Sequence, residues 1–293
     1  MFHIFKKAAQ TRLVTIGYPQ APAQIPENFR GAPCFEFAGW RDAHPAAEAC
    51  PAGAIAIEES EGLRRVTIDY GRCIYCGECS EADGSGAVKI TRDFELAVRG
   101  RGDLVTIAEY PIAPDGSQGE LTAVLTGSSL EHSPREALER KLQQQIHDLL
   151  GRSLAIREVD AGSCNGCEIE IGALNNPVYD LERLGIHFVA SPRHADMLLV
   201  TGPVTRNMEL ALAKTYRATP EPKVVVAVGA CGISGGIFGV NYATVGGVDA
   251  VVPVDVYIPG CPPRPHALLH GILLALGRME QRLGSRAKGQ SFF

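Results

Sequence analysis

Two closely spaced cysteines on a short turn most constrain what this chain can fold into. Cys164 and Cys167 flank Asn-Gly, so both thiolates can reach one metal centre. Two more cysteines come far downstream and singly, Cys231 after Gly-Ala and Cys261 after Pro-Gly. Small neighbours permit the close backbone approach that a bulky 4Fe–4S cluster requires, and backbone amides can donate hydrogen bonds to its sulfides. These four cysteines therefore predict one 4Fe–4S site.

Zinc is the alternative occupant of this cysteine set. Zinc ribbons usually take their ligands as two close pairs within a short stretch of chain. Here Cys231 and Cys261 are single and distant from the first pair, which favours a cluster held inside a folded domain.

A second cysteine set lies in the first third of the chain. Cys73, Cys76 and Cys79 have the ligand spacing of a bacterial two-cluster ferredoxin motif. In those ferredoxins the cysteine before proline in each motif ligates the other cluster, and Cys50, followed by Pro51, fits that role. The four cysteines predict a second 4Fe–4S cluster, and a zinc site or four inert thiols is the alternative.

The other half of this ferredoxin pattern has lost its ligands. Counting back from Cys50 places Trp40, Ala43 and Ala46 where thiolates would stand, and the remote position holds Asp83. All four positions are lost together, as expected when a whole cluster is dropped rather than one ligand exchanged. The region is therefore predicted to carry a single cluster.

Hydrophobic patterning predicts the main elements of both parts. Residues 54–59 and 65–69 alternate apolar and polar around a turn at 60–62, which indicates a hairpin. Ser133, Pro134 and Glu136 occupy the N-cap, N1 and N3 positions of a helix predicted to end near Gly151 and to join the two parts.

Strands and helices alternate in the last part of the chain. The predicted strands are Leu154–Val159, Ile186–Ala190, Met197–Thr201, Lys223–Val228 and Val254–Ile258, and the predicted helices lie around Tyr179–Leu184, Met208–Tyr216 and Pro265–Arg282. Alternation of this kind predicts a parallel sheet covered by helices. Cys164, Cys231 and Cys261 all follow predicted strands, so we expect them at the carboxyl edge of the sheet, where such folds carry their sites.

Composition excludes several classes of function. With a net charge of -5 and no basic block, the chain does not look like a nucleic-acid-binding protein. A Ser-His-Asp arrangement, a Walker motif and GxGxxG are all missing from the sequence. The chain has nine cysteines, and the clustered CxxC spacings among them, without a signal peptide, indicate metal in a reducing compartment. The uncharged run Val224–Val248 is too rich in glycine for a membrane helix.

The C-terminal motifs resemble a known family. The runs GSCNGCEIEIGALNNPVYD, SPRHADMLLVTGPVT, VGACGISGGIFG and VDVYIPGCPPRPHALLHGILLALG resemble the small subunit of membrane-bound, energy-converting nickel–iron hydrogenases of the formate hydrogenlyase type. That subunit is related to the subunit of respiratory complex I that holds the terminal cluster. The resemblance covers roughly Leu154–Glu280. Complex I has two adjacent cysteines where this chain has Cys164-x2-Cys167, which is the hydrogenase spacing.

The resemblance implies an electron-transfer subunit of an oxidoreductase. Electrons would pass through two 4Fe–4S clusters to or from a nickel–iron site in a separate large subunit, which reduces protons or oxidises hydrogen. The chain lacks the paired CxxC motifs that hold nickel, so it is not catalytic alone. The alternatives are the same subunit in a nickel-free complex I-like quinone or polysulfide oxidoreductase, and a redox-sensing or zinc-stabilised interaction module.

The resemblance also implies partners and a location. The partners would be the large subunit and the other iron–sulfur and membrane subunits of a complex I-like assembly. The chain would lie peripherally on the cytoplasmic face of the inner membrane, without a transmembrane segment.

The predicted architecture is α/β, with an N-terminal ferredoxin-like α+β module and a C-terminal flavodoxin-like parallel-sheet domain. The predicted divisions are an arm over 1–30, the one-cluster module over 31–100, a linker with a helix over 101–152, the hydrogenase-type domain over 153–285 and a tail over 286–293. Glu168 and Glu170, which follow the cluster turn, are candidates for groups that support the cluster or carry protons, and the alternative is a solvated role at a helix start. His266, at a predicted helix start near Cys261, is the one histidine to test as a ligand, and Cys34 is assigned no role.

Overall fold

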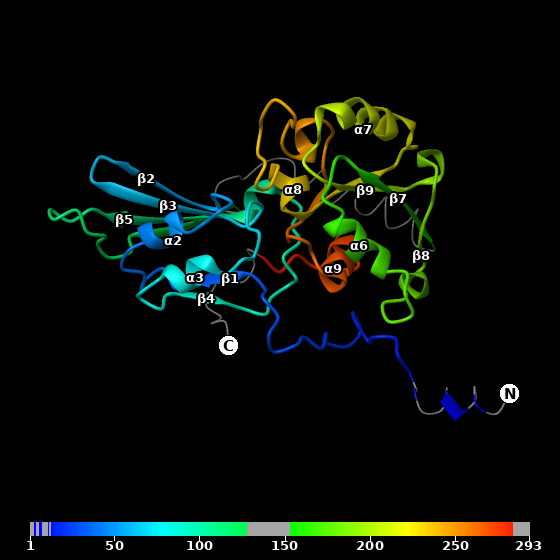
Figure 1. The fold of residues 1–293 in the computed structure, drawn as a ribbon, viewed down its shortest axis with the longest axis horizontal. Helices are drawn as coiled ribbons and strands as arrows, with labels where there is room; N and C mark the ends of the chain where they lie inside the picture. The colour runs from blue at the N-terminus through cyan, green and yellow to red at the C-terminus, as the bar shows by residue number, and fades with distance from the viewer. Residues whose placement is uncertain (1–2, 4–5, 8–10, 12, 128–152, 284–293) are drawn as a thin grey trace.

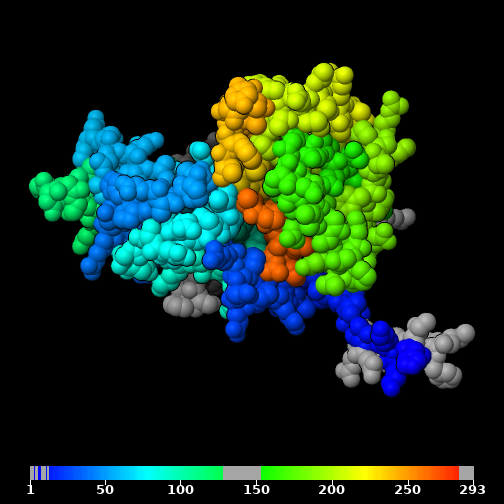
Figure 2. Space-filling model, viewed as in Figure 1, coloured from blue at the N-terminus to red at the C-terminus, as the bar shows by residue number. Residues whose placement is uncertain are grey.

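The computed structural model describes the chain except residues 1–2, 4–5, 8–10, 12, 128–152 and 284–293. An N-terminal lobe (residues 31–127) and a C-terminal lobe (residues 153–283) lie side by side (Figure 1). Residues 13–30 run along the C-terminal lobe and reach the N-terminal lobe at their end (Figure 2). The helix predicted between Ser133 and Gly151 lies outside the described residues.

The N-terminal lobe combines antiparallel sheets with short helices. Its elements are β1 Pro33–Phe35, α2 His44–Glu48, β2 Ile55–Ser60, β3 Leu63–Asp69, α3 Glu78–Ala82, β4 Val88–Ile90, a 3-10 turn at Arg101–Leu104, β5 Val105–Pro111 and β6 Ala123–Thr126. The predicted hairpin is confirmed, because β2 and β3 pair with Ser60 opposite Leu63. Between them Glu61 and Gly62 both have positive φ, 52° and 79°, which matches the twist of the strands they connect.

Strands β5 and β6 complete the larger sheet of this lobe. The strand order is β2-β3-β5-β6, and β5 pairs antiparallel with β3 along its whole length. These strands come from residues beyond 100, a region whose sequence shows no clear period. The smaller sheet pairs β1 with β4.

The C-terminal lobe contains the predicted parallel sheet. Its strands are β7 Leu154–Asp160, β8 Ile186–Phe188, β9 Met197–Thr201, β10 Val224–Val228 and β11 Val256–Ile258. They lie in the order β11-β10-β9-β7-β8, and all neighbours are parallel. Numbered along the lobe from its first strand, this is the 2-1-3-4-5 order of flavodoxin-like folds. The predicted strands and the predicted α/β fold class are confirmed.

Helices cover both faces of this sheet, and two of the three predicted helices differ from their prediction. The helices are α6 Gly166–Ala173, α7 Arg206–Ala218, α8 Gly229–Ser234 and α9 Pro265–Ala275, with 3-10 turns at Leu181–Leu184, Pro192–His194 and Val248–Ala250. The helix predicted around Tyr179–Leu184 is only a 3-10 turn. Helix α9 ends well before Arg282 because Gly277 has a φ of 68°. The Gly277 N–H donates to Leu274 O, and the Arg278 N–H donates to Leu273 O, both at 2.9 Å. These two bonds form a Schellman motif, which ends the helix.

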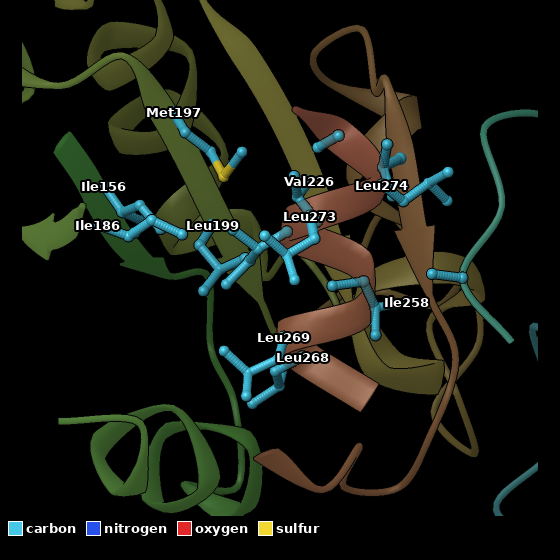
Figure 3. Packing of buried hydrophobic residues seen from close by; sticks show 14 of the residues in the cluster. Ile156, Ile186, Met197, Leu199, Val226, Ile258, Leu268, Leu269, Leu273 and Leu274 are labelled. Atoms are coloured by element: carbon cyan, nitrogen blue, oxygen red, sulfur yellow. The ribbon is translucent and has the colours of Figure 1, made fainter. Parts of the chain in front are cut away.

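The main core lies between α9 and the sheet. Every residue of α9 is buried, and Leu269 and Leu273 face Leu199 and Val226 of the strands (Figure 3). The opposite face of the sheet has a core of its own, which includes Leu198 of β9. Strands buried on both faces explain why their sequences read as continuous apolar runs.

The two lobes are joined by backbone pairing as well as by side chains. Val98 forms an isolated antiparallel bridge with Tyr257 of β11, through N–O distances of 3.0 Å and 2.8 Å. Tyr70, next to β3, packs against the cores of both lobes. The described part of the chain contains no helix that is long and apolar enough to span a membrane.

Candidate metal centres

The first candidate centre is a pocket in the N-terminal lobe. All four predicted ligands line it: Cys50 follows α2, Cys73 and Cys76 lie in the loop after β3, and Cys79 is on α3. The rest of the lining is almost entirely apolar and includes Phe35, Ile55, Ile68, Ile74 and Ile90. The fold therefore gathers the predicted set into one largely hydrocarbon-walled site.

Backbone amides point at two of these sulfurs. The Ala54 N–H donates to Cys50 Sγ at 3.2 Å, and the Tyr75 N–H donates to Cys73 Sγ at 3.4 Å. Tyr75 adopts a φ of 59°, a left-handed conformation that is uncommon for a bulky residue. Amide donors to sulfur stabilise thiolate ligands, and they are one of the means by which proteins tune iron–sulfur clusters.

Burial favours the protonated form of two thiols of this pocket, those of Cys73 and Cys79. It raises the pKa of Cys73 to about 12 and that of Cys79 to about 11, and repulsion from the neighbouring thiolates acts in the same direction. Only the thiolate ligates metal, so loading this site has to release protons.

The positions of the missing ferredoxin ligands are packed with hydrocarbon. Trp40, Ala43 and Ala46 are almost completely buried in one core cluster. The Trp40 ring lies 5.2 Å from that of Phe35 and 6.4 Å from that of Phe37. Aromatic rings thus occupy space next to the positions from which thiolates would ligate the other cluster of a two-cluster ferredoxin.

Asp83 is used in a turn. Its Oδ1 accepts from Ser85 N at 3.1 Å and Ser85 Oγ at 2.6 Å, and its Oδ2 accepts from Val88 N at 2.8 Å. Burial raises the pKa of Asp83, but these hydrogen bonds outweigh it and hold the pKa below its usual value. The carboxylate therefore stabilises the chain between α3 and β4.

The second candidate centre lies at the carboxyl edge of the parallel sheet, as predicted. Cys164 follows β7, Cys167 is on α6, Cys231 is on α8 after β10, and Cys261 follows β11. Burial raises the pKa of Cys167, and the negative charges of Glu168 and the other three thiols raise it further. A Cβ on Gly229, two residues before Cys231, would lie 2.9 Å from Cys167 Sγ and 3.3 Å from the carbonyl oxygen of Gly260, next to Cys261, so the segments that carry these cysteines lie together. Cys164 and Cys261 are exposed, whereas Cys167 is buried.

Glycines make room for these sulfurs. A Cβ on Gly229 would lie 2.9 Å from Cys167 Sγ, and a Cβ on Gly236 would lie 2.9 Å from Cys231 Sγ. Both distances are shorter than side chains tolerate. The backbone thus approaches the thiols as closely as a bulky inorganic cluster requires, so the residues present fit such a group.

Among the residues that the structure describes, no group of three or more His, Cys, Asp or Glu is close enough to hold a single metal ion. In a 4Fe–4S cluster four cysteines share four irons, so the sulfurs stand around a body larger than one ion.

Two charged residues beside the second centre have buried atoms without partners in the described part of the chain. Both carboxylate oxygens of Glu168 and the Nε and Nη1 of Arg264 make no hydrogen bond there. The Arg264 guanidinium stacks 4.3 Å from the centre of the Phe29 ring. Burial raises the pKa of Glu170, and Arg264 opposes that shift. Sequence reasoning missed Arg264, although its place three residues after Cys261 could have signalled it.

His266 and Cys34 lie in packed surroundings. The His266 ring contacts Tyr18, Phe94 and Tyr179 at centroid distances of 5.7, 5.6 and 5.3 Å. Burial and, second, the charge of Arg264 lower its pKa to about 4, so it is neutral at physiological pH. Cys34 in β1 is half-buried, and burial raises its pKa to about 11. It does not line the pocket of the first centre.

Comparison with known proteins identifies the family. The model of the NADH ubiquinone oxidoreductase 20 Kd subunit matches residues 164–275, which contain all four cysteines of the second centre. The probable membrane-bound hydrogenase subunit mbhJ of Pyrococcus furiosus is 47% identical over 54% of this chain and 92% of its own length. Formate hydrogenlyase subunit 7 of Escherichia coli is 53% identical over 47% of this chain. The chain belongs to the NADH ubiquinone oxidoreductase 20 Kd subunit family, which confirms the relationship inferred from the motifs.

The matches cover only part of the longer relatives. The aligned region spans 54% of formate hydrogenlyase subunit 7 and 62% of an NADH-quinone oxidoreductase subunit from Citrifermentans bemidjiense, which is 53% identical over 36% of this chain. A solved membrane-bound sulfane sulfur reductase, an archaeal respiratory membrane complex, contains a chain with 40% identity that covers 45% of this chain and 73% of its own length, at a TM-score of 0.40.

Gly229→Ala should empty the second centre selectively. The new Cβ would lie 2.9 Å from Cys167 Sγ, whereas Gly239→Ala places its Cβ where nothing lies within 4 Å. Both glycines have positive φ, 77° and 58°, so the backbone strain of the two variants is matched. We expect iron analysis to show a loss of about four irons for Gly229→Ala alone. Equal iron content in both variants would contradict the claim that Gly229 leaves room for a cluster beside Cys167.

Asp83→Cys should not create a further cluster. Three thiolates would still be missing at Trp40, Ala43 and Ala46, and the rings around Trp40 fill the adjacent space. We expect unchanged iron content and a lower thermal midpoint, because the carboxylate bonds to Ser85 and Val88 are lost. A rise to about twelve irons per chain would show that the site retains other ligands, with Cys34 the first to test.

Proposed function

We propose that this chain is an electron-transfer subunit with two 4Fe–4S clusters. One cluster would be held by Cys50, Cys73, Cys76 and Cys79, and the other by Cys164, Cys167, Cys231 and Cys261. The observation that carries the proposal is that the fold gathers two separate sets of four thiols, one in each lobe. Bound clusters would supply reversible one-electron chemistry.

The chain's own residues would hold the clusters and control their surroundings. The apolar wall of the first pocket limits water, and the amides of Ala54 and Tyr75 stabilise charge on sulfur. At the second centre Gly229 and Gly236 give the cluster room, and Arg264 offers a buried positive charge. Exposure, sulfur hydrogen bonding and net charge are the quantities that set cluster potentials.

We further propose that a separate large subunit with a nickel–iron site covers the second centre. Cys164 and Cys261 are exposed, so that cluster would face the partner. Large apolar side chains are also exposed on α6 and in the loop after α8: Ile169, Ile237, Phe238, Val240 and Tyr242. Tyr242 is 97% exposed, and apolar groups this open favour a binding surface.

The Cys164-x2-Cys167 spacing and the relatives named as hydrogenlyase and hydrogenase subunits favour hydrogen chemistry.

The alternative is the same role in a nickel-free quinone or polysulfide oxidoreductase. The Citrifermentans relative, named as an NADH-quinone oxidoreductase subunit, supports it through 53% identity over 107 residues. In either assembly the further partners would be other iron–sulfur and membrane subunits. We further propose a peripheral position at the cytoplasmic face of the inner membrane; the mbhJ relative, named as membrane-bound, supports the membrane association in this proposal.

Metal analysis tests the two-cluster proposal. The wild-type chain should contain about eight irons and as much acid-labile sulfide, and Cys76→Ala should remove one electron paramagnetic resonance signal and leave the other. Cys34→Ala, which changes a cysteine outside both sets, is the matched control and should keep both signals. Zinc in an amount that matches one site, or loss of both signals in Cys76→Ala, would refute two independent clusters.

The metal content and activity of the purified complex test which partner covers the second centre. We expect the complex to contain nickel and to evolve hydrogen from a low-potential donor. Cys164→Ala should abolish this activity and leave the cluster of the N-terminal lobe intact, because the exposed second cluster would be the last before the partner. A complex with both clusters and no nickel, which reduces a quinone or polysulfide, would favour the alternative.

A further inference from the structure

One hydrogen bond connects the chain segments that carry the two cysteine sets. The Ser234 hydroxyl at the end of α8 lies 3.0 Å from the carbonyl oxygen of Gly71 and also 3.0 Å from that of Ala230 in its own helix, so its one proton is shared between these two acceptors. Gly71 stands two residues before Cys73, and Ser234 stands three residues after Cys231. Short stretches of covalent chain therefore lead from each cysteine to the two ends of this bond.

The two segments touch because residue 71 is glycine. A Cβ there would lie 2.8 Å from Ile233 Cγ2 and 2.9 Å from Arg101 Cζ. The φ of Gly71 is not positive, so its missing side chain serves the close approach rather than an unusual backbone conformation. Ile233, next to Ser234, thus packs directly on the backbone that leads to Cys73.

The turn around Gly71 is held rigidly. The Asp69 carboxylate accepts two bonds from Arg101, Nη1 to Oδ1 at 2.9 Å and Nη2 to Oδ2 at 2.6 Å, and a third from Gly71 N–H at 2.9 Å. Fork-to-fork pairs of this kind fix geometry as well as charge. Tyr70 lines the first pocket and also packs against the core of the C-terminal lobe. The contact therefore has a defined geometry instead of being a loose surface touch.

A second connection between the centres contains a gap. Arg30 Nη1 donates to Cys76 O at 2.6 Å, and the neighbouring Phe29 ring stacks on Arg264. Arg264 leads to Cys261, but the step from Phe29 to Arg264 is a through-space stacking contact, with Arg264 Cζ 4.3 Å from the centre of the Phe29 ring. Electron tunnelling decays more steeply across such a gap than through covalent bonds and hydrogen bonds.

We infer that the Ser234–Gly71 contact is the route by which electrons cross between the two centres, an inference that rests on the proposed function. One electron leaves the cluster on one side, which is oxidised by one unit, and enters the other cluster, which is reduced by one unit. No proton or other atom moves. Ser234 and Gly71 are thus positioning residues, which hold the two cluster-bearing segments together without touching the irons.

The purified complex with both clusters loaded provides the test. Rapid-freeze electron paramagnetic resonance would follow reduction of one cluster and its re-oxidation by the other after mixing with a reductant. Ser234→Ala should keep both signals and both reduction potentials and slow the transfer between clusters. Ser234→Thr, which retains the hydroxyl, should transfer at the wild-type rate. Gly71→Ala should slow the transfer further, because the added methyl separates the segments.

Ser80→Ala is the matched control. Ser80 also adjoins a predicted ligand, Cys79, and its hydroxyl donates to the carbonyl of Val88 at 2.8 Å, but that bond stays within the N-terminal lobe. Its removal should leave the transfer rate unchanged. Unchanged transfer in Ser234→Ala, or slowing only in Phe29→Ala, would overturn the assigned route and leave the proposed function standing.

Two other outcomes separate the inference from the proposal beneath it. Loss of a cluster signal in Ser234→Ala would show that the contact supports assembly rather than transfer, and would overturn the route. A wild-type complex without two cubane signals would overturn the proposed function, and the route with it.

Discussion

The fold holds cysteine thiols close together although their ionised forms repel one another. Burial and this repulsion raise the pKa of Cys231 to about 11, and the same causes act on Cys73. Such an arrangement is unfavourable for bare thiolates and would become favourable if the proposed cationic iron neutralised them. The rest of the structure serves this requirement, because rigid strands fix where each loop begins and glycines such as Gly229 let the backbone come near the sulfur.

Much of this arrangement follows from local patterns in the sequence. Alternating and continuous apolar runs predict the β2–β3 hairpin and the five parallel strands, since burial on one or both faces imposes those patterns directly. Strand order then brings Cys164, Cys231 and Cys261 to one edge of the sheet. Spacing and small neighbours indicate both cysteine sets, and the structure places the members of each set together.

Other features depend on contacts between distant residues and could not be predicted. Strands β5 and β6 exist because β3 offers an edge, and their own sequence has no clear period. The early end of α9 depends on how Gly277 closes the last turn, and the good helix formers beyond it, such as Met279, Glu280 and Gln281, misleadingly extend the helical pattern. The Ser234–Gly71 bond and the partly buried Arg264 depend on how the lobes meet, and no local pattern encodes that.

The bridge between Val98 and Tyr257 has a consequence for how independent the two lobes are. β11 is an edge strand of the parallel sheet, and Val98 supplies hydrogen bonds to its outer side. An uncovered edge strand presents free N–H and C=O groups to any other chain. A C-terminal lobe produced alone would expose that edge, and an N-terminal lobe cut before residue 98 would lose its anchor. The two lobes therefore depend on each other. The N-terminal lobe covers part of an edge strand of the C-terminal lobe that would otherwise be open to pairing with another chain.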